Sequence, residues 1–440
     1  MFLLYFLLFI ISLILIYQNH RTLFVPPTII AITWALFPGL ACIGLLDLYE
    51  LSIKTHIIIL SAFFSFMLAY YSKIYKLFVG GRCGDDIGVK TTEKKEIELG
   101  YVNYKLLIVV NVIIIIWLGM HLKASITIIQ TRGYHALRTV YQDNFSESTI
   151  VNIIYGWFAK PFVIASLAIV SYDILARRKK MQIILFICVA INILLDTFVF
   201  AARATLVKFI VYIFFAFFFC KRRRYSRRQK LLIIMIALAG FVIISYITGQ
   251  RNVSGYSDFS VLDTVAMYYV APFGLLNYYI NNPLFSDLGI NNFMFGKSMF
   301  GFIYNIFRSA LYVLFRAEYN GSDYINQQVT QKFVYVAPHV RVNAECTAAY
   351  IFMRDFGFFG VLIGFAGVAV FCRTIKQRFD NYPSIRNGAL YIISLYVVFR
   401  LVSTYDFLSP ATFFSILYVL VCTKDFALGW GNHNDKPQAV

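Results

Sequence analysis

Charged residues are scarce in this sequence. Asp, Glu, Lys and Arg make up only 14% of its 440 residues, whereas 60% are hydrophobic and 18% are aromatic. Soluble domains contain about 25% charged residues, so this composition excludes a soluble protein. Because a helix needs roughly 20 apolar residues to cross a bilayer, the sequence predicts an integral membrane protein instead.

Patterns that would hold a metal, a disulfide or a removable leader are also missing. Of the seven cysteines only Cys346 falls in a predicted outer loop, which excludes a disulfide pair there. His-x-x-x-His, Cys-x-x-Cys and Asp-x-Asp spacings do not occur, so we expect neither a metal nor a cofactor. Residues 1–17 lack a basic segment and an Ala-x-Ala cleavage pattern, and we expect them to be a retained span.

Long apolar runs, by contrast, are abundant. Runs such as 108–118 and 231–247 are apolar on every face, which favours helices over strands. Residues 1–248 would contain spans one to eight, and residues 249–347 would form a large and partly helical outer loop. Residues 348–440 would contain spans nine to eleven and a cytoplasmic tail. We predict an all-α integral membrane protein with about eleven transmembrane helices, near residues 2–17, 23–46, 53–72, 105–121, 152–173, 182–200, 204–219, 231–248, 348–372, 387–403 and 407–423.

The basic residues predict how the chain is oriented. Forty Lys and Arg against 22 Asp and Glu give a net charge of +18. Of the forty, 25 lie in alternate loops on one side of the membrane, 11 lie in the opposite loops, and four lie within spans. The positive-inside rule assigns the side with 25 to the cytoplasm, which puts the amino terminus outside. The basic run 221–230 then marks orientation beside anionic lipid, and we expect no nucleic acid as a partner.

The outer loop 249–347 is far longer than the others, and its six basic residues balance six acidic ones. Its aromatic and Asn-rich stretches, 258–282 and 293–307, predict two amphipathic helices at the outer face. A loop of this length is functional or disordered, and this one is too apolar to be disordered. Tyr, Asn and Arg together suit a carbohydrate or a pyrophosphate, although an interfacial aromatic belt has the same composition.

Ionisable residues within spans, or at their outer ends, need a reason because each costs a few kcal/mol in hydrocarbon. Each also has a structural explanation: Arg203 could be an anchor that reaches outer headgroups, and Arg354 with Asp355 could be a local ion pair. The positions are Arg203, with Asp196 about two turns earlier, Arg251, His339 with Arg341, and Arg354 with Asp355. Convergence favours function, because the orientation places four of them at one outer interface, namely Arg203, Arg251, Arg341 and His339.

At these residues the chain resembles the Wzy-type O-antigen polymerases, which join oligosaccharide repeat units in bacterial surface polysaccharide synthesis. An apolar span leads to a hairpin of small residues and Arg at 201–204 (Ala-Ala-Arg-Ala), and a later helix contains Tyr269 and Pro272. The stretch 343–348 (Asn-Ala-Glu-Cys-Thr-Ala) then leads to 354–360 (Arg-Asp-Phe-Gly-Phe-Phe-Gly). The second of these stretches is similar to the Asp-Phe-Gly and Gly pattern at the start of the family's late span.

The resemblance implies an architecture like that of the GT-C-like glycosyltransferases, which use lipid-linked donors. It implies a site facing the periplasm in the bacterial inner membrane, where undecaprenyl-pyrophosphate-linked oligosaccharides are donor and acceptor. Membrane lipid and a chain-length regulator are the further partners implied. Pyrophosphate-binding residues would be Arg203, Arg251 and Arg341, and substrate-binding residues would be Tyr269, Asn343, Tyr350, Arg354 and Asp355.

In such a transfer an acceptor hydroxyl attacks the anomeric carbon and the lipid pyrophosphate departs. Fixed cations can meet the charge that develops on the leaving group, so we expect a metal-independent enzyme. The hydroxyl needs a base with a pKa near 7, and His339 is the natural candidate. Glu345 is the alternative, either alone or paired with Asp258 or Asp263.

Other functions remain open at this point. An O-antigen ligase would use the same donor, and a polyprenyl-phosphate-sugar glycosyltransferase could have its base at Asp47 or Glu50. A polysaccharide transporter or lipid flippase would use polar groups within spans, such as Asn192, Asp196 and Lys208. The sequence shows no internal repeat of the kind that transporters carry, and a scaffold would leave the arginines without a purpose.

Overall fold

A computed structural model describes residues 1–72, 100–132, 153–176, 180–200, 203–220, 266–338, 340–342 and 346–424 of the chain. Of these described residues 79% are helical, and six of the described helices are long and apolar enough to cross a membrane. A helical membrane protein is thereby confirmed. The six are α1 (Phe2–His20), α4 (Ile53–Tyr71), α6 (Tyr104–Arg132), η3 (Tyr155–Ala159) with α9 (Lys160–Ala176), α10 (Lys180–Phe200) and α17 (Ala348–Asn381).

Shorter helical segments coincide with four further predicted spans. They are α2 (Pro26–Ala31) with η1 (Ile32–Leu36) and α3 (Phe37–Cys42), α11 (Arg203–Phe219), α18 (Ile385–Arg400) and α19 (Pro410–Cys422). The remaining predicted span, 231–248, lies outside the described residues. The count of eleven spans therefore stays a prediction.

The helix over 26–42 is distorted at its centre for a reason that is visible in the sequence. The wide π-turn η1 immediately precedes Pro38. Proline has no N–H to donate, and its ring would collide with the carbonyl four residues earlier in a regular helix. The wider turn relieves that collision.

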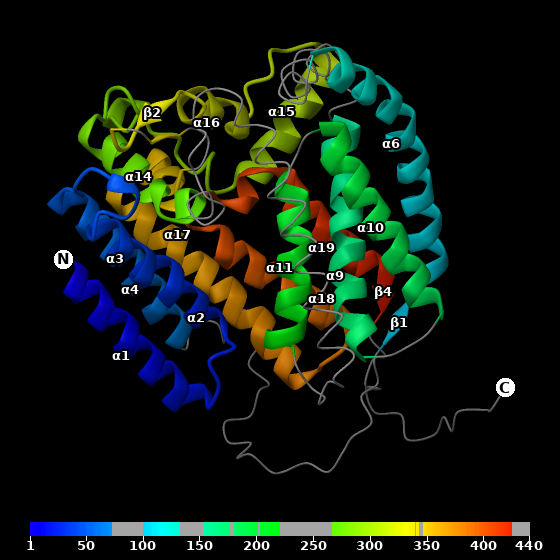
Figure 1. Cartoon of the computed structure of the whole chain (residues 1–440), viewed down its shortest axis with the longest axis horizontal. Helices are drawn as coiled ribbons and strands as arrows, with labels where there is room; N and C mark the ends of the chain where they lie inside the picture. Colours follow the sequence, from blue (N-terminus) through cyan, green and yellow to red (C-terminus); the bar gives the residue numbers. More distant parts are fainter. Residues whose placement is uncertain are drawn as a thin grey trace.

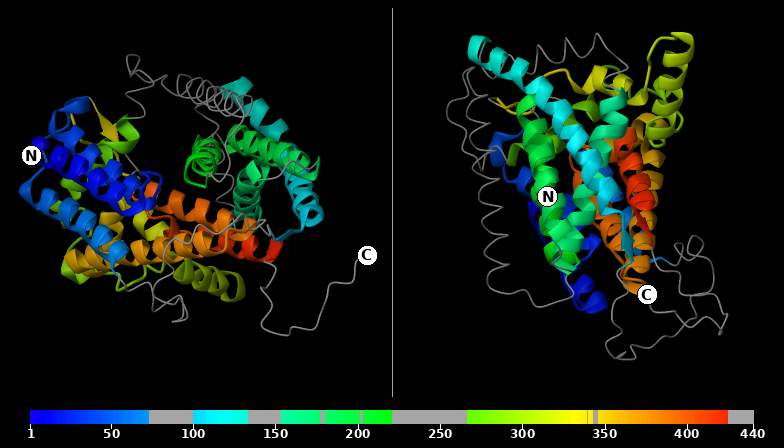
Figure 2. Two further views of the ribbon diagram at one scale, coloured as in Figure 1. Left: turned by 90° about the horizontal axis from the view of Figure 1, so that it is seen from below. Right: turned by 90° about the vertical axis from the view of Figure 1, so that its right-hand side faces the viewer.

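Helix α18 lies at the centre of the bundle. Thirteen of its residues are buried, and Gly388 lets it approach α9 so closely that a Cβ there would lie 2.6 Å from the ring of Tyr172. Figure 2 shows α1 to α4 on one side of α17 and α18, and α6, α9 and α10 on the other. The molecule thus has two groups of helices with α17 and α18 between them.

Residues 266–338 and 340–342 form a layer over one end of the helices (Figure 1). We call them the outer layer and that end the outer end. The layer contains α14 (Ala271–Asn281), η4 (Ile290–Asn292), α15 (Gly301–Phe315), α16 (Ser322–Thr330) and the antiparallel pair β2 (Val334–Tyr335) and β3 (Arg341–Val342). Of the two predicted amphipathic helices, α14 lies within 258–282. The second prediction, 293–307, began too early, because turns occupy the stretch before Gly301 and Gly296 there has a φ of +87°.

The outer layer is fixed to a break in α17. Phe356 and Gly357 leave the helical conformation, and Gly357 has φ 58° and ψ −138°, which residues with a Cβ rarely adopt. The carbonyl of Arg354, freed by the break, accepts a hydrogen bond of 2.7 Å from the N–H of Met294. Asp355 accepts two more from the backbone N–H groups of residues 298 and 299, at 3.0 and 2.5 Å. These bonds attach the outer layer to the helix.

The opposite end is marked by another strand pair. β1 (Tyr101–Val102) pairs with β4 (Thr423–Lys424), which joins the segment before α6 to the segment after α19. Figure 1 shows this pair far from the outer layer. Both segments belong to loops that the charge pattern assigns to the same side, so their position agrees with the predicted alternation of loops.

The packing of α17 predicts opposite effects for two glycines. A Cβ at Gly360 would lie 2.0 Å from the carbonyl oxygen of Phe352, whereas one at Gly367 would meet nothing within 4 Å. We expect Gly360→Ala to destabilise the protein by about 1–3 kcal/mol, as overpacking does. Gly367→Ala should be neutral or stabilise by about 0.5–1 kcal/mol, because alanine favours helix. Thermal unfolding of the purified variants in detergent measures both, and equal stability of the two variants would contradict the described break.

Candidate functional site

Five charged side chains converge inside the bundle. Lys208 of α11 lies within electrostatic range of Lys160 from α9, Asp196 from α10, Arg400 from α18 and Asp406 from the short helix η5 (Asp406–Leu408). We call these five residues the polar cluster. Its three cations are three of the four basic residues that the sequence places within spans. Because each charge is costly in a membrane, their convergence makes the polar cluster the candidate functional site.

Two of the three cations in the polar cluster contact a neighbouring described side chain, and the third does not. Arg400 Nε lies 3.7 Å from Asp406 Oδ1, and Lys208 Nζ lies 4.6 Å from the centre of the Tyr396 ring. Asp196 Oδ2 accepts a hydrogen bond of 2.5 Å from Thr205 Oγ1. Within the described ranges, Lys160 has neither an ion pair nor a hydrogen bond for its ammonium group.

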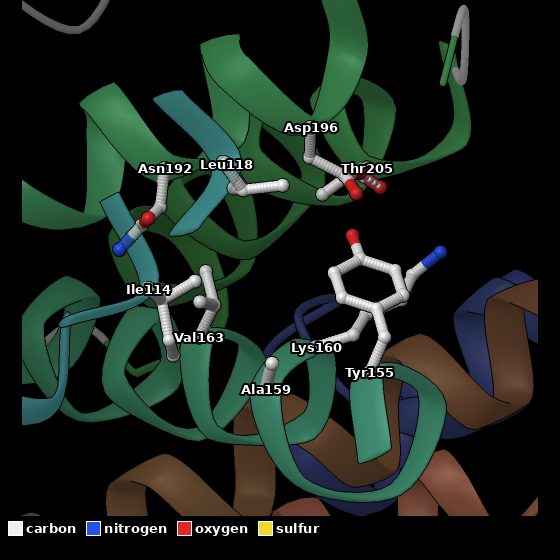
Figure 3. Close-up of a pocket in the computed structure, with 9 residues that line it drawn as sticks. All are labelled: Ile114, Leu118, Tyr155, Ala159, Lys160, Val163, Asn192, Asp196 and Thr205. Atoms are coloured by element: carbon white, nitrogen blue, oxygen red, sulfur yellow. Dashed lines mark hydrogen bonds between the residues drawn. The ribbon is translucent and has the colours of Figure 1, made fainter. Parts of the chain in front are cut away.

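A narrow cavity lies beside Lys160 and Asp196 (Figure 3). It has room for about one water molecule, which excludes a sugar ring. The Oδ1 atoms of Asp196 and Asn192 are buried there, and neither has a hydrogen-bond partner in the part of the chain that the structure describes. In Figure 3 the hydroxyl of Tyr155 points toward Asp196 and Thr205. The cavity thus gathers unsatisfied groups of both charge signs, an arrangement suited to holding charge or moving a proton.

The amide of Asn192, by contrast, has a structural role. Its Nδ2 donates to the carbonyl oxygen and the Oδ1 of Asn111, at 3.0 and 2.9 Å, and Asn111 in turn donates to Ser166 Oγ at 2.9 Å. These bonds join α10, α6 and α9. Such polar contacts commonly hold helices together within membranes.

The polar cluster lies at the outer end of the bundle. Arg386, at the start of α18, donates to backbone carbonyls at Leu420 and Thr423 near the β1–β4 pair, so Arg400 lies at the far end of that helix. The neighbourhood of Asp406 is covered by the outer layer, because Asn305 of α15 donates to the carbonyl of Leu408 at 2.8 Å. The cluster is therefore beneath the outer layer.

Helix α11 begins beside this site. Its first residue is Arg203, and Thr205, which bonds Asp196, lies in the same first turn. The backbone of Arg203 is therefore adjacent to the cavity, at the helix end where backbone N–H groups point outward. Among the other predicted site residues, Arg251, His339, Asn343 and Glu345 lie outside the described residues.

Three predicted substrate-binding residues lie together in a buried junction under the outer layer. Arg354 is only 3% exposed and pairs with Asp287 at 3.4 Å, rather than with its neighbour Asp355. It also donates to the hydroxyl of Tyr350 at 3.2 Å, which donates to the carbonyl of Ser286 at 3.0 Å. Asp355 bonds backbone N–H groups, as described above. The polar groups of this junction are mostly used to hold the outer layer in place.

The two other described candidates lie elsewhere. Tyr269 is half-buried, and its ring packs on that of Phe399 with ring centres 5.2 Å apart. Phe399 is the sequence neighbour of Arg400 in the polar cluster. Arg341 is exposed on strand β3. The predicted residues that the structure describes thus fall into separate places, and of these only Tyr269 and the backbone of Arg203 are adjacent to the cluster.

One acid outside the spans has a perturbed pKa. Asp323 of α16 accepts a hydrogen bond of 3.1 Å from the hydroxyl of Tyr319. Burial raises the pKa of the Asp323 carboxyl, so this group keeps its proton to higher pH than an exposed Asp does. Perturbed acids of this kind occur both at functional sites and in structural networks.

Comparisons with protein-family models, with curated proteins and with solved structures found no match to this chain. The resemblance to the Wzy-type polymerases therefore stays a prediction. Sequence reasoning also passed over Lys160, Thr205, Arg400 and Asp406. The available signal was a lone charge inside an apolar run, as at Lys160 between Ala159 and Pro161.

The ammonium group of Lys160, which has no partner among the described residues, predicts an unusual stability effect. We expect Lys160→Met to leave thermal stability unchanged or to raise it, because the substitution removes a cation that no described residue pairs with. Thr205→Val should instead lower stability by about 1–3 kcal/mol, since it takes away the donor to a buried carboxylate. Thr205→Ser, which keeps the hydroxyl, serves as its control. Thermal unfolding in detergent tests the pair, and a large loss of stability in Lys160→Met would show that the ammonium is structural.

Proposed function

We propose that this protein joins undecaprenyl-pyrophosphate-linked oligosaccharide repeat units into surface polysaccharide, O-antigen or capsule, by glycosyl transfer at the periplasmic face of the inner membrane. The observation that supports the proposal is the convergence of Lys160, Lys208 and Arg400 beneath the outer layer, beside the start of α11 at Arg203. A lipid-linked pyrophosphate would place its negative charge near these cations, at the outer end of the bundle.

Charge balance supports an anionic ligand. The polar cluster has three cations against the two carboxylates Asp196 and Asp406. Arg203, a further basic residue, is the first residue of α11 beside the cluster. The N-terminus of α11 favours anions as well. Arginine binds two phosphate oxygens at once, whereas lysine supplies a compact charge. In this proposal Arg203 and Arg251 bind the pyrophosphate, and Lys160 and Lys208 provide positive potential from beneath it.

The transfer itself would occur above the cavity, because the cavity is too narrow for a sugar. An acceptor hydroxyl attacks the anomeric carbon of the donor as the bond from that carbon to the pyrophosphate oxygen breaks. His339, or Glu345 in its place, takes the proton of the hydroxyl. The cations of the site meet the charge on the departing pyrophosphate, so the proposed enzyme requires no metal.

A lipid-linked glycan transporter or flippase is the second candidate. Oδ1 of Asp196 and the ammonium of Lys160, neither of which has a partner among the described residues, line one cavity within the span region, which is also an arrangement for proton-coupled transport. An O-antigen ligase would use the same donor as a polymerase and differ only in the acceptor. The products formed distinguish the three functions.

Substitution at the cationic site should shorten the polysaccharide. In a strain that lacks its own copy of the gene, we expect Arg203→Ala or Lys160→Met to reduce long chains to single repeat units at normal protein levels. Lys54→Gln, which removes an exposed cation at the start of α4, is the matched control and should support normal lengths. Gel analysis of the polysaccharide gives the answer; complete loss of attached units would indicate a ligase.

A purified system separates transfer from transport. Protein in liposomes, given lipid-linked repeat units in a membrane where no translocation is needed, should form polymer. We expect Arg203→Ala to slow this reaction by about 10²–10³-fold, the usual cost of losing one charge-stabilising group. Translocation of the lipid-linked unit without polymer formation would support the transporter instead.

A further inference from the structure

The β2–β3 hairpin presents an exposed aromatic surface that the proposed transfer does not use. Phe333 is 56% exposed, Tyr335 54% and Phe285 46%. The cations Lys332 and Arg341 lie against these rings. We call the five residues Phe285, Lys332, Phe333, Tyr335 and Arg341 the aromatic patch.

The patch consists of two groups, each with a cation that lies against aromatic rings. The guanidinium carbon of Arg341 lies 4.4 Å from the ring centre of Phe333 and 5.7 Å from that of Tyr335. Lys332 Nζ lies 5.0 Å from the ring centre of Phe285. Neither cation forms an ion pair with any residue that the structure describes. No described residue therefore neutralises either charge.

The patch is rigid because the other side of the hairpin is buried. Tyr335 lies opposite Arg341 in the strand register, and the intervening valines Val334, Val336, Val340 and Val342 are buried. The carbonyl of Val336 accepts a hydrogen bond of 2.9 Å from the N–H of Tyr49. The backbone that carries Tyr335 and Arg341 is thus fixed without a ligand, which lowers the entropy cost of binding one.

The predicted orientation puts the hairpin on the outer side of the bilayer. Figure 1 shows β2 in the outer layer, on the side of α14. Exposed rings in water pack well on the apolar faces of sugars, and unpaired cations beside them bind carboxylate or phosphate groups. Aromatic faces and positive charge together match an acidic saccharide.

We propose that the aromatic patch binds an acidic oligosaccharide, with Phe333, Tyr335 and Phe285 against the pyranose rings and Lys332 and Arg341 at its anionic groups. The inference rests on the proposed function, in which the ligand is part of the repeat unit or growing chain. It assigns Arg341 to glycan binding rather than to the pyrophosphate. The patch would hold the saccharide while its lipid end reaches the polar cluster.

Binding of defined saccharides tests the proposal. The full-length protein, in nanodiscs of zwitterionic lipid so that no sugar detergent competes, is titrated calorimetrically with oligogalacturonate and with maltooligosaccharide of equal length. We expect the acidic saccharide to bind at least tenfold more tightly. Phe333→Ala should weaken the binding of both saccharides at least tenfold, and Arg341→Gln should remove the preference for the acidic one.

Matched controls come from the same layer. Phe307 of α15 is 58% exposed, and Phe307→Ala removes an equally exposed ring; Lys297→Gln removes a cation that lies over Tyr304. Both should bind like the unaltered protein, and unchanged unfolding temperatures should show that every variant is folded. Equal binding by all variants, or displacement of the saccharide by anionic vesicles, would overturn the proposal.

The proposal and the proposed function can fail separately. If the aromatic patch binds no saccharide while Arg203→Ala abolishes polymer formation, only the patch assignment is wrong. If the patch binds acidic saccharide while Arg203→Ala and Lys160→Met polymerise normally, the proposed catalytic site is wrong.

Discussion

The structure depends on how the backbone hydrogen-bonding groups find partners where α17 breaks. In an uninterrupted helix the carbonyl of Arg354 would accept from the fourth residue along, but the conformation of Gly357 removes that partner. An unsatisfied carbonyl costs several kcal/mol when it is away from water. Met294 of the outer layer supplies the missing N–H, and Asp355 binds two more. The outer layer is therefore part of what makes the broken helix stable, and the break gives the layer its place.

This dependence extends to the polar cluster. The first turn of α17 bonds the end of α18, because the N–H of Ala348 donates to the carbonyl of Leu401 at 2.8 Å. Arg400 precedes that carbonyl by one residue. Asn305 of the outer layer holds Leu408, close to Asp406. The charged groups within the bundle are thus positioned partly by hydrogen bonds from the layer above them.

The sequence predicts those parts of the fold that composition controls. Apolar runs locate the helices because the bilayer requires them, and Pro38 explains the wide turn before it. The stretch 354–360, noticed through a family resemblance, has a physical meaning in the structure: Gly357 makes the break and Asp355 receives the outer layer. The resemblance indicated its importance, although not this role.

The site could be predicted only in part. The cost of charge in hydrocarbon singles out Asp196 and Lys208 from sequence, and it should also have singled out Lys160 and Arg400. That these residues meet could not be predicted, because the order in which helices pack around α18 is decided by close contacts such as that of Gly388 with Tyr172. Likewise the partner of Arg354 is Asp287, far away in sequence, and not the adjacent Asp355.

The strand pair β1–β4 has a consequence for biogenesis. Tyr101 pairs with Lys424, and the N–H of Asn103 donates to the carbonyl of Cys422. Contacts so distant in sequence form late, since closing so long a loop costs entropy before the contact can form. During synthesis at the ribosome, the segment that leads into α6 therefore waits, without its strand partner, until every helix from α6 to α19 has been made. The pair closes only then, which makes it a marker for the completion of folding.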